Sequence, residues 1–273
     1  MAPQGGTPTD GRKEQPAYMK YGHVTTNGVT VPPIGLGCWM GNATEDEVRK
    51  TLWNALDAGY RYFDTATLYG NEHIVGEVLK NTAKAIESSL KVLGVDYLDM
   101  YLMHTPLPFK PNDDCTEALR DLDGSFIVED TPLSETWRVL EKYYHKGIIR
   151  SLGVSNFSIP QIQDILDNCE VPPHNLQMEV HIYLAQENLV NFCKSNGITV
   201  TGYSTLGSPG RKDNPVGSFI DGSCLDEPLV RRLAEKYADM EELSGLDQDK
   251  HFFPFDFAYH HPNYPYQKPV DQQ

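Results

Sequence analysis

The chain has 273 residues and lacks long hydrophobic runs. No uninterrupted apolar stretch approaches the roughly 18–20 residues that a membrane span needs. Its first twenty residues, MAPQGGTPTDGRKEQPAYMK, are polar and contain no apolar core of a secretory signal. We therefore expect a cytoplasmic protein with no membrane partner.

Positive charge is scarce. The chain carries 23 lysines and arginines against 38 aspartates and glutamates, which gives a formal net charge of −15. This balance argues against nucleic acid or an anionic membrane surface as the main partner. It remains compatible with a phosphorylated small ligand, which needs only local positive charge.

Cysteine patterns typical of disulfide frameworks or zinc sites are absent. The five cysteines are scattered and form no C-x-x-C pair, so we expect reduced thiols. His260 and His261 have no partners at metal-ligand spacing, and we therefore expect no metal. The cysteines are Cys38, Cys115, Cys169, Cys193 and Cys224.

What the chain does have is an alternation of strand-like and helix-like segments, which is typical of a parallel sheet with helical crossovers. No G-x-G-x-x-G follows a strand, so the dinucleotide-binding fingerprint of a Rossmann unit is missing. An Asn27-Gly28 pair between β-forming residues predicts a hairpin before this alternation. The strand-like segments are 31–38, 60–66, 97–104, 149–156, 175–184 and 198–207, and the helix-like segments are 44–59, 71–94, 134–147, 159–169, 185–197 and 226–243.

Polar residues gather where the strand-like segments end. Barrel enzymes with parallel strands place their sites at this end of the sheet. Each residue alone has a simpler explanation: Asp64 and Tyr69 as cap or surface groups, Ser155-Asn156 as a helix cap, and His181 as packing at the rim. The residues at these ends are Asp64, His104, Ser155, Asn156, His181, Tyr203 and Ser204.

Several collinear segments resemble the aldo-keto reductases. Together they extend over most of residues 20–240, and their combination is far more specific than any one of them. They are IGLGCW, GYRYFDTATLYGNEHIVG, DYLDMYLMHTP, GIIRSLGVSNFS, NLQMEVHIYLAQENLVNFCKSNGITVTGYSTLGSPGR and, in the tail, HHPNYPYQ.

The resemblance implies an α/β fold, a (β/α)8 TIM-type barrel whose N-terminal hairpin closes the bottom. It also implies NADPH-dependent reduction of small carbonyl compounds, aldehydes and ketones, by a monomer. The corresponding domains are a loose N-terminus over 1–16, a barrel over 17–243 and an aromatic, proline-rich tail over 244–273. The tail could line a substrate pocket or merely cover exposed core.

The same resemblance assigns roles to residues. Tyr69 matches the proton donor, Asp64 a supporting member of the catalytic group, and His104 the histidine that orients the carbonyl. The remaining matches concern the cofactor. Ser155, Asn156 and Gln177 match groups that hold the nicotinamide carboxamide, and Tyr203 matches the aromatic residue that stacks on the nicotinamide ring. Ser204, Leu206 and Ser208 match the loop along the pyrophosphate. Gly37, Cys38 and Trp39 match the first cofactor and substrate loop.

Two segments of the family pattern are missing. The family's third strand carries a lysine beside the tyrosine, yet here the helix-like segment runs on past Lys80 and Lys84 with no apolar strand between. The eighth strand and the basic segment that grips the 2′-phosphate are also absent after LAEKYA, so NADH remains an alternative to NADPH.

Six of eight strands leave two breaks in the barrel wall, and unpaired edges promote association. A contracted barrel, a rearranged sheet or oligomerisation could cover them, and a shortened splice form that folds poorly is a further alternative. Without the lysine we expect impaired activity, and a non-catalytic chain that binds a ligand or partner is the alternative function.

Overall fold

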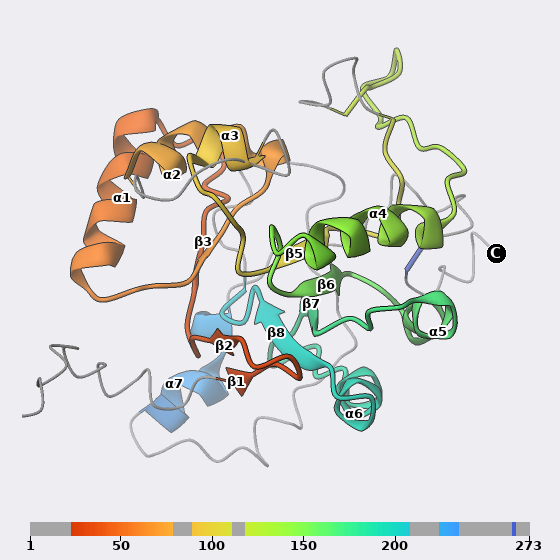
Figure 1. The fold of residues 1–273 in the computed structure, drawn as a ribbon. Helices are drawn as coiled ribbons and strands as arrows, with labels where there is room; N and C mark the ends of the chain where they lie inside the picture. Colours follow the sequence, from red (N-terminus) through yellow and green to blue (C-terminus); the bar gives the residue numbers. More distant parts are fainter. Residues whose placement is uncertain (1–22, 79–88, 111–117, 208–223, 235–263, 266–273) are drawn as a thin grey trace, which may run out of the picture.

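The computed structural model describes residues 23–78, 89–110, 118–207, 224–234 and 264–265, and shows an α/β chain with parallel strands that alternate with helices (Figure 1). The loose segment expected over 1–16 and nearly all of the aromatic tail lie outside these residues. The helices are α1 (Glu45–Asp57), α2 (Glu72–Val78), α3 (Ser89–Leu93), α4 (Leu133–His145), α5 (Ile159–Asn168), α6 (Glu187–Ser195) and α7 (Pro228–Ala234). The strands are β1 (His23–Val24), β2 (Thr30–Val31), β3 (Leu36–Gly37), β4 (Phe63–Asp64), β5 (Tyr101–Met103), β6 (Leu152–Ser155), β7 (Asn175–Glu179) and β8 (Thr199–Tyr203).

The six strands of the alternation form two separate parallel sheets. β3 pairs with β4, and β5, β6, β7 and β8 form a four-stranded sheet in chain order. Within the described residues β4 does not pair with β5, nor β8 with β3. The expected barrel is therefore not closed.

Helix α1 begins and packs as its sequence predicts. Thr44 and Glu47 form a capping box, in which the Glu47 carboxylate accepts a hydrogen bond from the Thr44 backbone N–H at 2.8 Å. Val48, Leu52 and Ala55 form its buried face. The helical segment expected over 71–94 is seen only at its two ends, as α2 and α3, because 79–88 lie outside the described residues.

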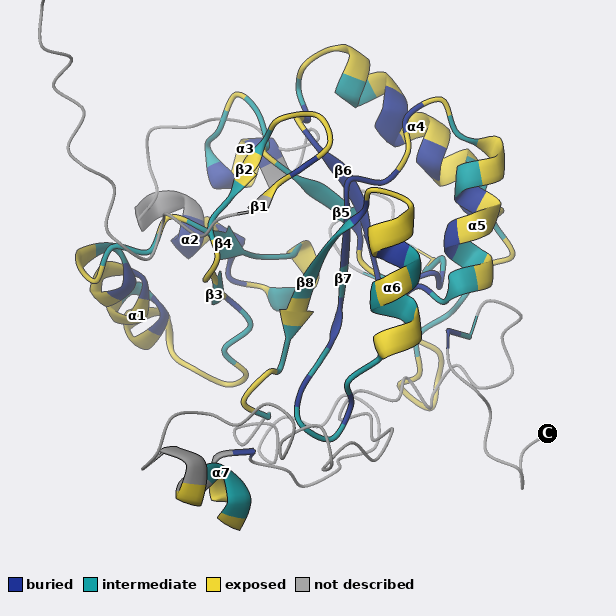
Figure 2. Cartoon of the chain, turned by 90° about the horizontal axis from the view of Figure 1, so that it is seen from below, coloured by how far each residue is buried: buried dark blue, intermediate teal, exposed yellow. Residues whose placement is uncertain are grey.

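The larger core lies between the four-stranded sheet and helices α4, α5 and α6. Figure 2 shows β6 and β7 buried at its centre, while these helices turn exposed faces outward. Trp137 of α4 is 1% exposed, and its indole N–H donates to the Val171 carbonyl at 3.0 Å. Leu152, Val154 and Leu176 pack into the same cluster.

The hairpin β1–β2 contacts the larger sheet near the start of β6. Gly28 at φ 85° supports its turn, as expected from the Asn27-Gly28 pair. The Asn27 side-chain amide donates to the Arg150 carbonyl, and Ser151 Oγ donates to Asn27 Oδ1 at 3.2 Å. The hairpin is thereby tied to the end of the sheet opposite the polar strand ends.

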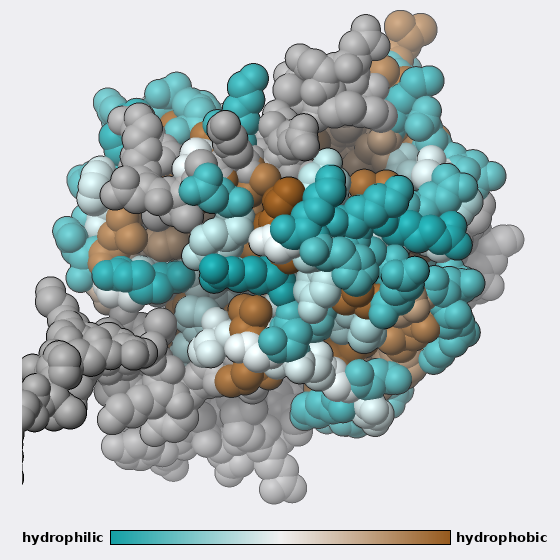
Figure 3. Space-filling view, in the orientation of Figure 1, coloured by the Kyte–Doolittle hydropathy of each residue, from teal (hydrophilic) through white to brown (hydrophobic). Residues whose placement is uncertain are grey.

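The described surface mixes hydrophilic residues with scattered apolar ones (Figure 3). Among the described residues, no helix has the length and hydropathy that crossing a membrane would require.

Candidate active site

The turn after β4 places an acid and a phenol at one end of the sheet. Asp64 is the last residue of β4, and a 3-10 turn over Thr67–Tyr69 follows. The Tyr69 backbone N–H donates to the Ala66 carbonyl at 2.9 Å, and Gly70 ends the turn at φ 69°, where glycine avoids strain. This turn explains why Tyr69 lies five residues beyond Asp64.

The rings of Tyr69 and His104 are in contact between β4 and β5, two strands that do not pair with each other among the described residues. Their ring centroids are 5.8 Å apart and the rings are nearly perpendicular, at 86°. Edge-to-face contact of this kind is a preferred arrangement of aromatic rings. The two residues that the sequence predicts as proton donor and carbonyl-orienting group are therefore neighbours.

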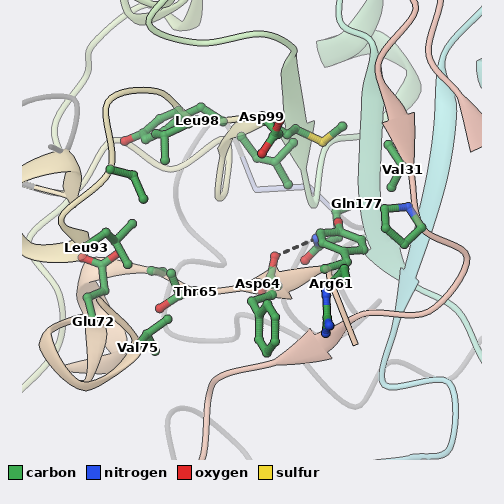
Figure 4. A pocket seen from close by; sticks show the side chains of 18 of the residues that line it. Val31, Arg61, Asp64, Thr65, Glu72, Val75, Leu93, Leu98, Asp99 and Gln177 are labelled. Atoms are coloured by element: carbon green, nitrogen blue, oxygen red, sulfur yellow. Dashed lines mark hydrogen bonds between the residues drawn. The ribbon is translucent and has the colours of Figure 1, made fainter. Parts of the chain in front are cut away.

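Asp64 is held by a neutral partner. The Gln177 Nε2 donates to Asp64 Oδ2 at 3.0 Å, as the dashed line in Figure 4 shows. Gln177 lies on β7, so this bond joins the two sheets. Among the described residues no lysine or arginine forms an ion pair with Asp64, and Lys80 and Lys84 lie outside the described ranges.

The surroundings of Tyr69 favour its neutral form. Burial raises the pKa of the phenol, and the charge of Asp64 and then Cys38 act in the same direction. A nearby ammonium would have the opposite effect on this pKa. Tyr69 is thus a weaker acid here than a phenol in water.

His104 is also kept neutral. His104 is exposed at the rim of the cavity. Desolvation by the protein groups around its ring lowers its pKa, and the Asp64 carboxylate offsets only part of that decrease. At neutral pH the imidazole therefore has one N–H donor and one acceptor nitrogen.

Asn156 connects the ends of three strands. Its amide donates to the His104 carbonyl at 2.9 Å and to Ser155 Oγ at 3.1 Å, and it accepts from the Tyr203 hydroxyl at 2.6 Å. Ser155 and Asn156 are both buried, and Asn156 has φ 63°, a left-handed conformation that asparagine tolerates. The structure thus brings together Ser155, Asn156 and Tyr203, with His104 beside them.

These groups fit the amide end of a nicotinamide cofactor. Asn156 and Gln177 present side-chain amides, Ser155 a hydroxyl and Tyr203 an aromatic ring at one end of the sheet. In this structure they already form hydrogen bonds with one another, with the His104 carbonyl and with the Asp64 carboxylate. A bound carboxamide would exchange partners with them rather than fill unused donors.

The positions expected along the pyrophosphate are less enclosed. Ser204 has φ 51°, Leu206 is 60% exposed, and Ser208 lies outside the described residues. Three further positions, Gly37, Cys38 and Trp39, lie at the end of β3 and are not among the described residues that line the cavity.

Cys38 is buried directly after β3. It is 0% exposed, and burial together with Asp64 raises its pKa to about 12. Asn71 Nδ2 donates to its carbonyl at 2.7 Å, which ties the end of β3 to the start of α2. Cys38 therefore belongs to the smaller hydrophobic core, with Leu52 and Ile74.

A cavity of about 620 Å³ opens beside Asp64 and Tyr69, within the range of about 300–1,000 Å³ for ligand pockets. The sequence did not single out several of its walls: Tyr62, Glu72, Tyr101 and the segment Val29–Pro32 of the hairpin. Tyr62 and Tyr101 sit inside strand-like segments, and only the pairing of strands could have placed their side chains here.

His181, also at a strand end, is a packing residue. Its Nδ1 accepts the Tyr183 backbone N–H at 3.3 Å, and its Nε2 lies 3.1 Å from Glu179 Oε1, with both side chains fully buried. Among the described residues no group of three or more potential ligands could hold a metal ion.

Comparison with known proteins agrees with this arrangement. The model of the Aldo/keto reductase family matches residues 33–84 and 80–244, in two pieces that meet where the third strand is missing from the pattern. Relatives named "Aldo-keto reductase family 1 member A1" are 38% identical in Pongo abelii and Homo sapiens over 242 residues, covering 77% of this chain and 71% of each relative. The protein of that name from Gallus gallus is 35% identical over 243 residues, with the same coverage. The chain is a member of the aldo/keto reductase family of oxidoreductases.

Proposed function

We propose that this chain is a nicotinamide-dependent carbonyl reductase whose turnover is reduced. The observation that carries the proposal is the contact of Tyr69 with His104 beside Asp64, at the C-terminal ends of parallel strands in a family member. The substrate class is a small aldehyde or ketone.

The roles follow from the groups that each side chain offers. Tyr69 donates its phenolic proton to the oxygen of the substrate carbonyl, and the phenol is restored by a proton from solvent. The neutral His104 donates an N–H to the same oxygen and orients it. When bound, NADPH would supply the hydride for the carbonyl carbon, and with the proton from Tyr69 the products would be an alcohol and NADP+.

Ser155, Asn156 and Gln177 would hold the nicotinamide end of the cofactor, with Tyr203 against its ring. Ser204 and Leu206, together with Ser208 from outside the described residues, would bind the pyrophosphate, and Gly37, Cys38 and Trp39 would form the first cofactor and substrate loop. We favour NADPH because the family resemblance implies it, with NADH as the alternative because the basic 2′-phosphate segment is missing from the sequence.

Reduced turnover follows from the electrostatics of Tyr69. Its pKa is raised, and the Asp64 carboxylate accepts a hydrogen bond from the neutral Gln177 amide rather than from an ammonium among the described residues. A preorganised group that stabilises charge in a transition state is worth roughly 10²–10³ in rate. We expect turnover to be lower than in a relative with the lysine by about that factor.

The fold that we propose for this function is an incomplete (β/α)8 barrel over residues 17–243. Strands β3 and β4 supply the first two barrel strands, and β5 to β8 supply the fourth to seventh. We expect a cytoplasmic monomer, with association through the open edges as the alternative.

A second candidate is a non-catalytic member that binds a ligand or partner. The Gln177–Asp64 bond favours it, because the residue expected to hold the cofactor instead holds the catalytic aspartate.

The experiment is a measurement of NADPH consumption with an aromatic aldehyde by the wild type and by Tyr69→Phe. We expect slow turnover in the wild type and a further loss of about 10²–10⁴ in the variant, the usual contribution of general acid catalysis. Tyr143→Phe is the matched control, since Tyr143 lies on α4 under Lys146 and away from the cavity lining.

Cofactor binding, measured by fluorescence in the same samples, distinguishes the two candidate functions. Equal rates for the wild type and Tyr69→Phe would remove Tyr69 from the reaction. Tight cofactor binding with no turnover would favour the non-catalytic candidate.

A further inference from the structure

Tyr62 is fixed beside the smaller sheet by its backbone and by its ring. It directly precedes β4, and its carbonyl accepts the Leu36 N–H at 2.9 Å. Its ring lies against Gly35, where an added Cβ would come within 2.7 Å of the ring carbon Cδ1. Real Cβ atoms do not approach a carbon that closely, so glycine at position 35 lets the ring lie over the backbone. The ring therefore has a defined place in the cavity wall.

The hydroxyl of Tyr62 reaches the larger sheet. It forms hydrogen bonds with the side chains of Thr201 and Gln177. These two residues are paired neighbours on β8 and β7, so their side chains lie on the same face of the sheet. Thr201 Oγ1 is itself held, because it accepts a hydrogen bond from the Asn175 side-chain amide at 3.0 Å. One phenol thus connects the start of β4 to two strands of the larger sheet.

Gln177 has two protein partners on the side of the smaller sheet. Its Nε2 donates to Asp64 Oδ2 at 3.0 Å, and its side chain also forms a hydrogen bond with the Tyr62 hydroxyl. The terminal torsion of a glutamine side chain has broad minima, so a single partner leaves the amide free to turn. A second partner restricts that rotation. The phenol and the carboxylate together therefore fix the orientation of Gln177.

The other buried carboxylate of the cavity lies elsewhere. Glu72 is 6% exposed and accepts a hydrogen bond from Thr67 Oγ1 at 3.2 Å. Figure 4 shows Glu72 beside Leu93, whereas Asp64 and Gln177 lie together on the other side of the cavity. Asp64 is thus the carboxylate toward which Gln177 is turned.

The orientation of Gln177 matters for the cofactor site. Ser155 pairs with Gln177 in the register of β6 and β7, and Asn156 follows Ser155. The proposed function assigns these three residues to the nicotinamide carboxamide. Ser155 and Asn156 are bonded to each other, whereas Gln177 is bonded to Asp64 and Tyr62. A carboxamide that recruits Gln177 must therefore replace both of these partners.

We infer that Tyr62 is a positioning residue that holds Gln177 on Asp64 and away from the cofactor. Its hydroxyl stabilises the cofactor-free arrangement, so the affinity for the cofactor is lowered by the strength of that one hydrogen bond. The inference rests on the proposed function for the identity of the cofactor, whereas the orientation of Gln177 can be measured without cofactor.

The first test is Tyr62→Phe, which removes the hydroxyl and keeps the ring that lies against Gly35. NADPH should bind this variant about 2- to 10-fold more tightly than the wild type in a fluorescence titration, because one net hydrogen bond is worth that factor. A residue that only supported the fold would not increase affinity when it is truncated. The control is Tyr97→Phe, which removes a hydroxyl from the same lining at a ring that stacks on Arg150, and it should leave the affinity unchanged.

A double-mutant cycle shows whether Tyr62 acts through Gln177. In a chain that carries Gln177→Met, Tyr62→Phe should no longer change the affinity for NADPH, because the amide that it releases is gone. An equal gain in both backgrounds would assign the effect to a direct contact of Tyr62 with the cofactor and would contradict a positioning role.

The wild type supplies a readout that needs neither a folded variant nor turnover. Without cofactor, we expect nuclear Overhauser cross-peaks between the side-chain amide protons of Gln177 and the ring protons of Tyr62. Saturating NADPH should remove them. The cross-peaks of the Asn175 amide with Thr201 should remain and serve as the control.

Two results would overturn the inference. One is an affinity for NADPH that is unchanged or weaker in folded Tyr62→Phe. The other is a set of cross-peaks between Gln177 and Tyr62 that is absent from the cofactor-free wild type or persists at saturating NADPH. If neither protein binds a nicotinamide cofactor, the proposed function fails, and the cofactor-free cross-peaks then decide whether Tyr62 holds Gln177.

Discussion

The four-stranded sheet and the two-stranded sheet differ in how much structure supports them. β5 to β8 are joined by continuous parallel ladders, and their core contains Trp137, Leu152 and Leu176. β3 and β4 share only two paired positions and pack on a smaller cluster around Leu52 and Ile74. The proposed site draws on both, because Asp64 and Tyr69 come from the small part and His104 and Gln177 from the large part. Chemistry here depends on the weaker part remaining docked on the stronger one.

The largest effect is expected in the core of the four-stranded sheet. Trp137→Ala removes a side chain that is 1% exposed and a hydrogen bond to Val171, and large aromatic truncations in cores cost about 3–5 kcal/mol. Denaturant unfolding should show this loss over the whole chain. A loss below about 1 kcal/mol would contradict the assignment of Trp137 to the main core.

Truncation in the smaller core should act locally. Leu52→Ala, at a residue that is 0% exposed, is expected near the lower end of the roughly 2–5 kcal/mol range, because fewer buried groups surround it. Amide exchange should speed up in α1, β3 and β4 and remain slow in β6 and β7. Uniform acceleration would show that the two parts unfold as one unit.

The link between the parts is tested by Gln177→Met, which removes the donor to Asp64 while keeping the length of the side chain. We expect a loss of about 1–3 kcal/mol, because a partly buried carboxylate is left without this bond. The control is Gln163→Met on the exposed face of α5, where Gln163 donates a hydrogen bond to Asp167. This substitution should change the free energy of unfolding by no more than about 0.5 kcal/mol.

High pH should weaken the same junction. Burial is the largest cause that raises the pKa of Tyr62, Tyr69 and Tyr101, which all line the cavity. Above pH 10 the unfolded chain loses these protons while the folded chain keeps them, so stability is full below pH 10 and falls as pH rises. The loss grows with pH until the folded chain also begins to release these protons. Tyr69→Phe should flatten the alkaline limb of a pH series of melting curves, and an unchanged limb would contradict the shift.

The smallest effect is expected at the exposed ion pair of Arg150 with Asp99, whose atoms lie 3.2 Å apart. Both side chains are at least half exposed, so Asp99→Asn should cost about 0–1 kcal/mol and less at high salt. A larger loss would mean that this pair anchors the start of β5.

Local patterns were sufficient for the secondary structure. The capping box of Thr44 and Glu47 and the periodicity of α1 and α4 predicted these helices to within a few residues. The strand-like segments are all present, although β3 and β4 shrink to two residues each. Their length depends on a neighbouring strand, which composition cannot show. Among the described residues the wall is open between β4 and β5 and between β8 and β3, where the sequence lacks the third and eighth strands of the family pattern.

The site could be predicted only as a set of positions. Residues after strands were expected near one another, and Tyr69 and His104 are. The bond between Gln177 and Asp64 was not foreseen, because it joins residues 113 positions apart that the family resemblance assigned to separate tasks. The burial of Cys38 was missed for a related reason, since its environment comes from α1 and α2 rather than from its own loop.

The contact of Tyr69 with His104 is the central claim, and a nuclear Overhauser measurement on isotope-labelled protein tests it most directly. The account predicts cross-peaks between the ring protons of Tyr69 and those of His104, because the ring centroids are 5.8 Å apart. Their absence, with both rings giving cross-peaks only to water, would contradict the account.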